Sequence, residues 1–269
     1  MGIRSVEVKS ILQASKLPGA KYVINPYSGC VHGCVYCYAR FMKRFTGHLE
    51  PWGTYLDARI NAPEILRKQL SRRKEPLRET VFLSSVTDLY QPPEAQFRLT
   101  RQILAVLLEY QIPISILTKS DLVLRDIDLL SQFEDCSVGL SIQSTDDELA
   151  RRLEPRATPP SRRLQALRTL REKGIDTYAF ISPFLPGLSD LRSLLEALSG
   201  VVEEAGIEAI NMRGGNWTGV EQMLRRYYPE KAAECERLSR DENYWSNLER
   251  EARDLGKHFQ IEVSGFYRH

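Results

Sequence analysis

The sequence predicts an α/β protein, an incomplete (β/α)6 barrel similar to a TIM barrel, with a helical C-terminal cap. Short apolar segments alternate with amphipathic segments along most of the 269 residues. Each intervening segment is long enough to cross between parallel strands. Polar residues gather where the apolar segments end. Residues 1–215 are expected to form the partial barrel, and 216–269 a cap on the same body.

The expected strands are short and rich in Val, Ile, Phe and Tyr. They are residues 21–25, 80–84, 113–118, 137–142, 176–181 and 208–212. Helices with an apolar face are expected between them, at residues 63–71, 96–110, 126–133, 161–173 and 189–204. The cap is expected to hold helices at 220–228, 230–240 and 244–257 and a short strand at 260–263.

The composition is that of an ordinary globular protein. Hydrophobic residues make up 42% and charged residues 27%, and 37 Lys plus Arg against 35 Asp plus Glu leave a net charge of +2. A chain of this size buries about 73% of its extended surface when it folds as one body, so it needs no disulfides. No apolar run approaches the roughly 18 residues of a membrane span, and the first residues lack a signal peptide's apolar core. We expect a cytoplasmic protein that does not enter a membrane.

Polar side chains follow five of the expected strands. In parallel α/β folds the functional site lies at the carboxyl ends of the strands. A structural loop could have almost any composition, so this clustering is the first indication of a site. The segments are 84–88, 118–120, 141–144, 182–183 and 211–215.

Three of the five cysteines lie within eight residues, at Cys30, Cys34 and Cys37. Such clustering in a cysteine-poor chain predicts a metal centre. Tetrahedral zinc would need a fourth ligand, for which His32 and His48 are candidates. An iron-sulfur cubane on three thiolates would keep one iron open for chemistry.

The Cys-x3-Cys-x2-Cys spacing, with Tyr36 before the last cysteine, resembles the radical S-adenosylmethionine (SAM) superfamily. Further segments resemble its branch that contains spore photoproduct lyase, often labelled DNA repair photolyase-like. They follow the order and spacing of that branch from about Tyr22 to Asn211. These segments are NPYSGC from Asn25, CVYCYAR from Cys34, TDLYQP from Thr87, LTKS from Leu117, RD from Arg125, SIQ from Ser141, EP from Glu154 and RL from Arg163.

The resemblance implies a lyase-like enzyme in which Cys30, Cys34 and Cys37 hold a 4Fe-4S cluster and SAM completes its fourth iron. Reduction of SAM then gives a 5'-deoxyadenosyl radical that abstracts hydrogen from the substrate, with the electron supplied by a reductant such as flavodoxin or ferredoxin. Tyr36 and Tyr38 would flank the adenosyl group. The other implied SAM contacts are Thr87, Lys119, Ser141, Gln143 and Ser182, at successive strand ends.

Two departures from the family pattern bear on the reaction. The Gly-Gly-Glu segment that binds the SAM amino group in many members is missing, and Asp88 is the candidate substitute. Spore photoproduct lyase carries a hydrogen-donating cysteine where this chain has Ser85. A serine O–H bond is too strong to replace a thiol in quenching a carbon radical. The residues thus identify no catalytic side chain and argue against repair of thymine lesions by that route.

Two other classes of function remain open from the residues alone. One is a structural zinc-binding nucleic-acid module without catalysis, with Cys30, Cys34, Cys37 and His48 as ligands. The other is an iron-sulfur electron carrier that does not bind SAM. Nucleic acid or a nucleotide is the first expectation for a substrate, with a peptide or small metabolite close behind. Residues 151–173 hold eight basic side chains, which form either a solvated face or a phosphate-binding track.

Overall fold

The computed structural model describes residues 2–17, 19–213 and 215–269. The chain divides into two compact units. Unit 1 comprises Met1–Gly33, Ala39–Val138 and Glu172–Asp176, and unit 2 comprises Cys34–Tyr38, Gly139–Arg171 and Thr177–His269. Cys30 therefore belongs to unit 1, whereas Cys34 and Cys37 belong to unit 2. Gly214, within the last of the polar strand-end segments, lies outside the described residues.

The central strands of unit 1 run in the order β2-β3-β6-β7. β3, β6 and β7 pair in parallel, and β2 joins β3 in the antiparallel direction. Alternate residues of β7 are buried, as expected for a strand with a core face. These strands are β2 (Leu12–Ala14), β3 (Tyr22–Ile24), β6 (Val81–Leu83) and β7 (Ile114–Thr118).

A second, smaller sheet in unit 1 was not predicted. β1 (Gly2–Val6) pairs in parallel with β5 (Tyr55–Arg59), which pairs antiparallel with β4 (Tyr27–Ser28). β1 is almost wholly exposed, and its two large apolar residues, Ile3 and Val6, do not alternate with polar ones as in a half-buried strand. The sheet matters for function because β4 leads directly into the loop of Cys30. Tyr27 and Val31 pack in one buried cluster with Leu56, Ala58 and Leu99, which fixes the position of that loop.

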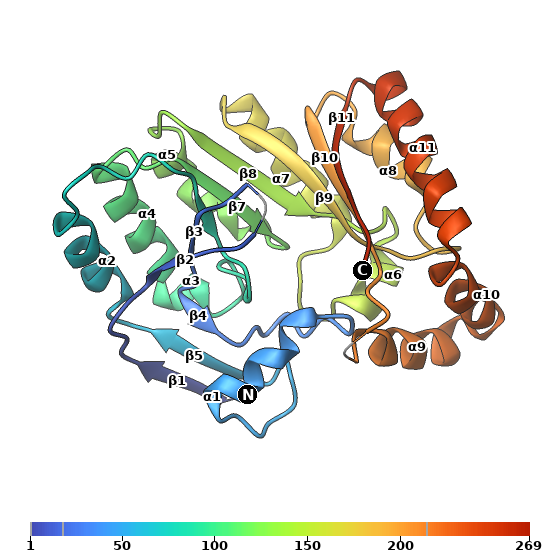
Figure 1. The fold of residues 1–269 in the computed structure, drawn as a ribbon, viewed down its shortest axis with the longest axis horizontal. Coiled ribbons are helices and arrows are strands. Elements are labelled where there is room, and N and C mark those ends of the chain that lie inside the picture. The colour runs from blue at the N-terminus through green and yellow to red at the C-terminus, as the bar shows by residue number, and fades with distance from the viewer. Residues whose placement is uncertain (1, 18, 214) are drawn as a thin grey trace. The chain divides into compact units, whose positions relative to one another are not determined.

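Two long helices of unit 1, α2 (Ala62–Ser71) and α4 (Leu99–Glu109), pack against each other and lie side by side in Figure 1. The helix expected at 96–110 is broken, because Arg98 has a positive φ of 52°. The remaining helices are short: η1 (Tyr38–Met42), which begins at the unit boundary, α1 (Lys43–Thr46), α3 (Glu94–Phe97), η2 (Asp121–Asp126) and α5 (Ile127–Leu130).

The strands of unit 2 run in the order β8-β9-β10-β11, and β9, β10 and β11 pair in parallel. The unit boundary passes through β8 after Val138. The strand expected at 208–212 lies earlier in the chain, at 204–209. Within it, a Cβ at Gly206 would lie 2.8 Å from the Phe180 ring, so glycine allows that ring to approach the strand. The bounds are β8 (Cys136–Ser141), β9 (Asp176–Phe184), β10 (Glu204–Ala209) and β11 (Glu262–Tyr267).

Side-chain caps define where three helices of unit 2 begin. Asp146, Asp190 and Asp241 each accept a hydrogen bond from a backbone N–H in the first turn of the helix that follows. α11 packs against α8 and β11, beside which Figure 1 shows it. The helices are α6 (Asp147–Leu153), α7 (Pro160–Glu172), α8 (Leu191–Leu198), α9 (Asn216–Tyr227), α10 (Pro229–Ser239) and α11 (Glu242–Phe259).

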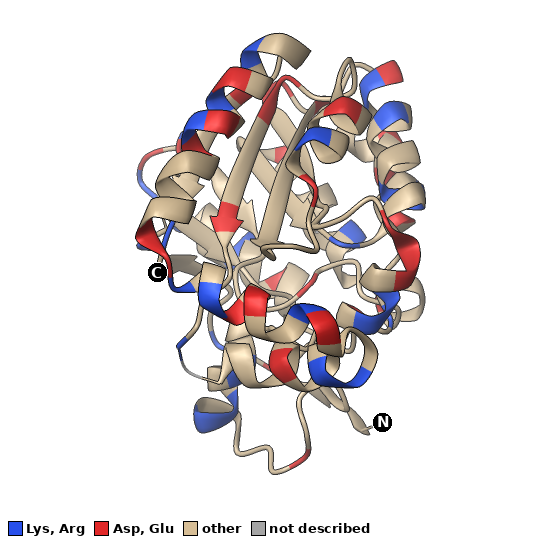
Figure 2. Cartoon of the chain, turned by 90° about the vertical axis from the view of Figure 1, so that its right-hand side faces the viewer, with Lys and Arg blue, Asp and Glu red and all other residues tan. Residues whose placement is uncertain are grey.

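The predicted fold class is confirmed: this is a mixed α/β fold with parallel strand pairs and crossover helices. Acidic and basic residues are interspersed along most of the described helices (Figure 2), whereas α1 carries only the basic residues Lys43 and Arg44. None of the described helices combines the length and the apolar character that crossing a bilayer requires.

Candidate active site

The loop that carries Cys30 is buried, and side chains from the segment after β6 bind its backbone. Thr87 Oγ1 donates to the Gly29 carbonyl at 2.5 Å, and Gln91 Oε1 accepts from the Val31 N–H at 2.8 Å. Gln91 Nε2 also donates to Thr87 Oγ1 at 3.0 Å. A buried loop outside regular secondary structure needs such partners for its peptide groups. Thr87, one of the predicted SAM contacts, thus also positions the loop.

Asp88 binds His32, the histidine between the first two cysteines. Its Oδ2 lies 3.2 Å from His32 Nε2 and accepts from the Lys119 N–H at 2.8 Å, while Oδ1 accepts from Thr118 Oγ1 at 2.7 Å. Burial alone would raise the pKa of Asp88, but His32 and these hydrogen bonds hold it well below its ordinary value. The carboxylate is therefore an ionised anchor that joins the cysteine loop to the end of β7. His32 is buried and does not lie at the loop surface.

Ser85 is tied to the chain before the cysteine loop. The Asn25 Oδ1 accepts from the backbone N–H groups of Ser85 and Val86 at 2.9 and 3.1 Å. Asn25 Nδ2 donates to Ser85 Oγ at 3.3 Å. The side chain of Asn25 thus caps the turn that follows β6.

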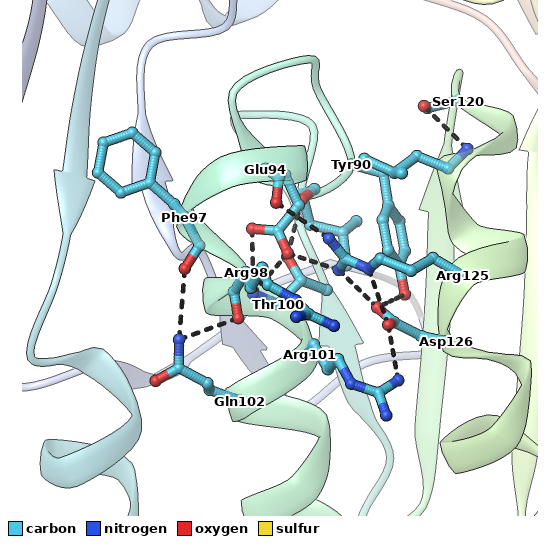
Figure 3. A network of polar contacts seen from close by, with 12 residues as sticks. Tyr90, Glu94, Phe97, Arg98, Thr100, Arg101, Gln102, Ser120, Arg125 and Asp126 are labelled. Atoms are coloured by element: carbon cyan, nitrogen blue, oxygen red, sulfur yellow. Dashed lines mark hydrogen bonds and ion pairs between the residues drawn. The ribbon is translucent and has the colours of Figure 1, made fainter.

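A network of charged side chains surrounds Glu94, Arg125 and Asp126 (Figure 3). Glu94 accepts from Tyr27 Oη and, at 2.7 Å, from Arg125, which also binds Asp126 at 2.7 Å. Glu94 also accepts, at 3.2 Å, from the N–H of Thr100, the second residue of α4. Burial, followed by the charge of Glu94, raises the pKa of Tyr27 far above its ordinary value, so Tyr27 stays a proton donor.

In unit 2, Tyr36 is anchored by a second buried ion pair. Tyr36 Oη donates to Glu154, which pairs with Arg163, a side chain only 1% exposed. Arg163 also donates to the Ser141 carbonyl at 2.7 Å and to the Thr158 carbonyl at 2.5 Å. Burial, then Glu154, raises the pKa of Tyr36 well above its ordinary value. This group fixes the residue before Cys37 to the end of β8.

Three more predicted residues of unit 2 lie near strand ends. Ser141 Oγ donates to the Ser182 carbonyl at 3.4 Å, and Ser182 Oγ donates to Glu208. Glu208 also contacts His269 Nε2 at 3.0 Å. Burial raises the pKa of Tyr38, and the neighbouring Cys37 and Glu208 raise it further. Glu208, at the carboxyl end of β10, is therefore part of this group.

Gln143 is the unusual polar residue of unit 2. Its side chain is fully buried, and neither its amide oxygen nor its amide nitrogen has a hydrogen-bond partner among the residues that the structure describes. Its backbone carbonyl accepts from Ser189 Oγ at 2.8 Å, so the residue itself is held in place. Leaving a buried polar group unpaired costs about 1–3 kcal/mol. The amide offers both a donor and an acceptor to a ligand.

Comparison with known proteins identifies the family. The sequence model of the Radical SAM superfamily matches residues 24–199, which include the cysteine motif and most strand ends described above. The chain belongs to the radical SAM superfamily.

Individual relatives agree with this membership. An uncharacterized protein of Methanocaldococcus jannaschii is 37% identical over 228 residues, which are 85% of this chain and 84% of the relative. The Radical SAM Nalpha-GlyT isomerase of Pseudomonas phage M6 is 26% identical over 91% of this chain and 50% of its own length. A spore photoproduct lyase variant with bound AdoMet and dinucleoside spore photoproduct has a TM-score of 0.67 at 17% identity, covering 99% of this chain and 81% of that one.

The zinc alternative finds no support in this radical SAM protein. His48, its proposed fourth ligand, lies with Nε2 2.9 Å from Asp57 and Nδ1 3.1 Å from Glu50, and its ring stacks on Tyr55. Both ring nitrogens already have polar neighbours.

Four of the eight basic side chains in residues 151–173 of this radical SAM chain form ion pairs within the protein. Arg151 and Arg152 both bind Glu148 at 2.8 Å, and Arg171 binds Glu203 at 2.9 Å. Arg163 is buried in the Tyr36 anchor. The structure therefore favours the solvated face over a continuous phosphate track for residues 151–173.

The sequence did not predict several residues that build the candidate site of this radical SAM protein. No role was predicted for Gln91, Glu94, Glu208 or His269. His32 was named as a candidate fourth ligand for zinc. Glu154 and Arg163 were part of the resemblance, but their mutual pairing could not be foreseen. The signal that was available is polarity: Gln91 lies within the TDLYQP segment, Glu94 follows that segment by two residues, and both are fully buried.

We predict that Arg163→Met destabilises the protein by about 3–5 kcal/mol, because it leaves the buried carboxylate of Glu154 without its cation. The free energy of unfolding from urea denaturation measures the effect. Arg168→Met, an exposed position on the same helix, is the matched control and should change stability by less than about 0.5 kcal/mol. Equal effects of the two variants would show that the ion pair is not what holds this region.

Proposed function

We propose that Cys30, Cys34 and Cys37 bind a 4Fe-4S cluster and that polar side chains at the strand ends bind SAM. When bound, these cofactors supply a 5'-deoxyadenosyl radical that abstracts a hydrogen atom from the substrate. The observation that carries the proposal is the three thiols within eight residues, inside the segment matched by the family model. Cys30 and Cys34 are buried, which suits a centre that must be shielded from water.

The two cysteines outside the motif, Cys136 and Cys235, are both buried. Burial raises the pKa of Cys136 to about 12 and that of Cys235 to about 11. Thiols with such values stay protonated at neutral pH and are poor metal ligands. They are therefore natural controls for the motif cysteines.

The protein's own residues would position the cofactors rather than react with them. Thr87, Gln91 and Asp88 fix the backbone that presents Cys30, and Tyr36 is fixed by Glu154 and Arg163. Among the predicted SAM contacts, Gln143 fits best, since its buried amide can bind an edge that both donates and accepts hydrogen bonds. The Lys119 backbone N–H donates to Asp88, which holds this residue at the end of β7. From there its ammonium would bind the carboxylate of SAM.

We propose a nucleic acid or a nucleotide as the substrate class. The support comes from the relatives: the structurally similar spore photoproduct lyase holds a dinucleoside spore photoproduct. Ser85, whose hydroxyl is bound by Asn25, offers no thiol to return a hydrogen atom at that position. The closing step therefore differs from one that uses a cysteine there.

Anaerobic reconstitution of the wild-type chain, followed by dithionite and SAM, is expected to give 5'-deoxyadenosine. Cys30→Ala should lose both the iron and the product, whereas Cys136→Ala should keep both. Iron and sulfide analysis with chromatography of the products measures this. A verified cluster that yields no 5'-deoxyadenosine would contradict the enzymatic proposal. A Cys30→Ala variant that keeps its cluster would contradict it as well.

Gln143→Leu is expected to raise the dissociation constant of SAM about tenfold, because the ligand loses a buried hydrogen-bonding partner. Its free energy of unfolding should not fall, since an unpaired buried amide is replaced by an apolar group of similar shape. Equilibrium binding and urea denaturation measure the two effects. Gln165→Leu, at an exposed position of α7, is the control. Unchanged SAM affinity together with reduced stability would show that Gln143 serves core packing and does not bind SAM.

With a nucleotide substrate deuterated at the reacting position, deuterium should appear in the 5'-deoxyadenosine. Oligonucleotides and dinucleotides are expected to raise the yield of 5'-deoxyadenosine above that of SAM alone, and peptides are not. Mass spectrometry of the product reads the transfer. Stimulation by peptides alone would contradict the substrate class while leaving the radical chemistry intact.

A further inference from the structure

The segment that directly follows the cysteine motif exposes large apolar side chains. Phe41, Phe45 and Leu49 are 42%, 75% and 93% exposed. Phe41 and Phe45 meet edge to face, with ring centroids 6.3 Å apart. Several large apolar side chains exposed along nine residues are unusual for a surface that only meets water.

The same segment lies in a stretch of the chain without acidic residues. No Asp or Glu occurs between Glu7 and Glu50, whereas the stretch holds six Lys and Arg. Two of these, Lys43 and Arg44, lie between the exposed phenylalanines. The Lys43 ammonium donates to the Leu49 carbonyl at 3.2 Å, which keeps its charge beside the exposed leucine. We call Phe41, Lys43, Arg44, Phe45 and Leu49 the post-motif surface.

Chain connectivity keeps this surface near one proposed cluster ligand. Phe41 follows Cys37 by four residues, and a fully extended chain of four residues spans at most about 14 Å. A protein that delivers electrons to the cluster must approach close to it. A molecule bound at the post-motif surface would meet that requirement.

We propose that the post-motif surface docks the electron donor, an acidic one-electron carrier protein of the flavodoxin or ferredoxin class. The inference rests on the proposed function, which requires an external reductant. An apolar centre with cations beside it suits a transient contact with an acidic protein, since the cations steer the encounter and the apolar side chains exclude water.

The composition of the surface favours a protein over a nucleic acid as its partner. Leu49, its most exposed member, has no ring on which a base could stack. The edge-to-face contact of Phe41 and Phe45 turns an edge of one ring toward the other and so leaves less open face for a base. A phosphate track would also need more cations in a row than the pair formed by Lys43 and Arg44.

The test compares two reductants on the reconstituted holoenzyme. In the variant Lys43→Glu/Arg44→Glu, 5'-deoxyadenosine formation driven by reduced flavodoxin should fall about tenfold or more at low ionic strength. The rate with dithionite, a small molecule that needs no docking surface, should match wild type. Flavodoxin binding, followed by titration at low and high salt, should weaken in parallel. Phe45→Ala/Leu49→Ala should also weaken binding, with little dependence on salt.

The matched control is Arg72→Glu/Lys74→Glu, the same charge change at exposed positions after α2. It should leave both rates and flavodoxin binding near wild type. The proposal is overturned if this control loses as much as the surface variant, if the surface variant keeps its flavodoxin-driven rate, or if its dithionite-driven rate falls equally. It is also overturned if the surface variant loses only oligonucleotide binding.

Failure of the docking proposal and failure of the proposed function are distinguishable in this design. If wild type with a verified cluster makes no 5'-deoxyadenosine with dithionite, the proposed function fails. If the dithionite reaction proceeds and charge reversal leaves flavodoxin binding unchanged, only the docking surface is wrong.

Discussion

The buried loop of Cys30 has to satisfy its peptide groups without the help of a helix or a sheet, and much of unit 1 serves that need. Gln91 and Thr87 bind the backbone on either side of Cys30, and Asp88 holds His32. Each of these residues comes from the segment after β6. A loop that must present a thiol in a fixed direction gains that rigidity from side chains rather than from a ladder of backbone hydrogen bonds.

In unit 2, a buried ion pair holds Tyr36, the residue before Cys37, in place. Tyr36 is bound by Glu154, whose charge is balanced by Arg163, and Arg163 reaches on to the end of β8. A buried ion pair adds little net stability, because desolvation offsets much of its attraction. It does make alternative positions of Tyr36 costly. The pairing therefore serves geometry more than stability, as expected for a residue next to Cys37.

Much of the fold could be predicted because the signals are local. β3, β6, β7 and β8 coincide with expected strands to within two residues, since each is short, apolar and bounded by polar turns. The errors have non-local causes. β1 has no apolar alternation and exists because β5 pairs with it. At the break at Arg98, the Glu94 carboxylate accepts from the N–H of Thr100 in the first turn of α4.

The candidate site divides in the same way. The sequence by itself determined the chemistry: three closely spaced cysteines and a set of polar strand ends are properties of residue type and spacing. Only the tertiary structure decided which of these polar side chains form hydrogen bonds within the chain and which have no partner among the described residues. Thr87 and Asp88 hold the cysteine loop, whereas the buried amide of Gln143 has no partner among the described residues. The physical reason is that a hydrogen-bond partner is chosen by proximity in space, which residues far apart in sequence acquire only when the chain folds.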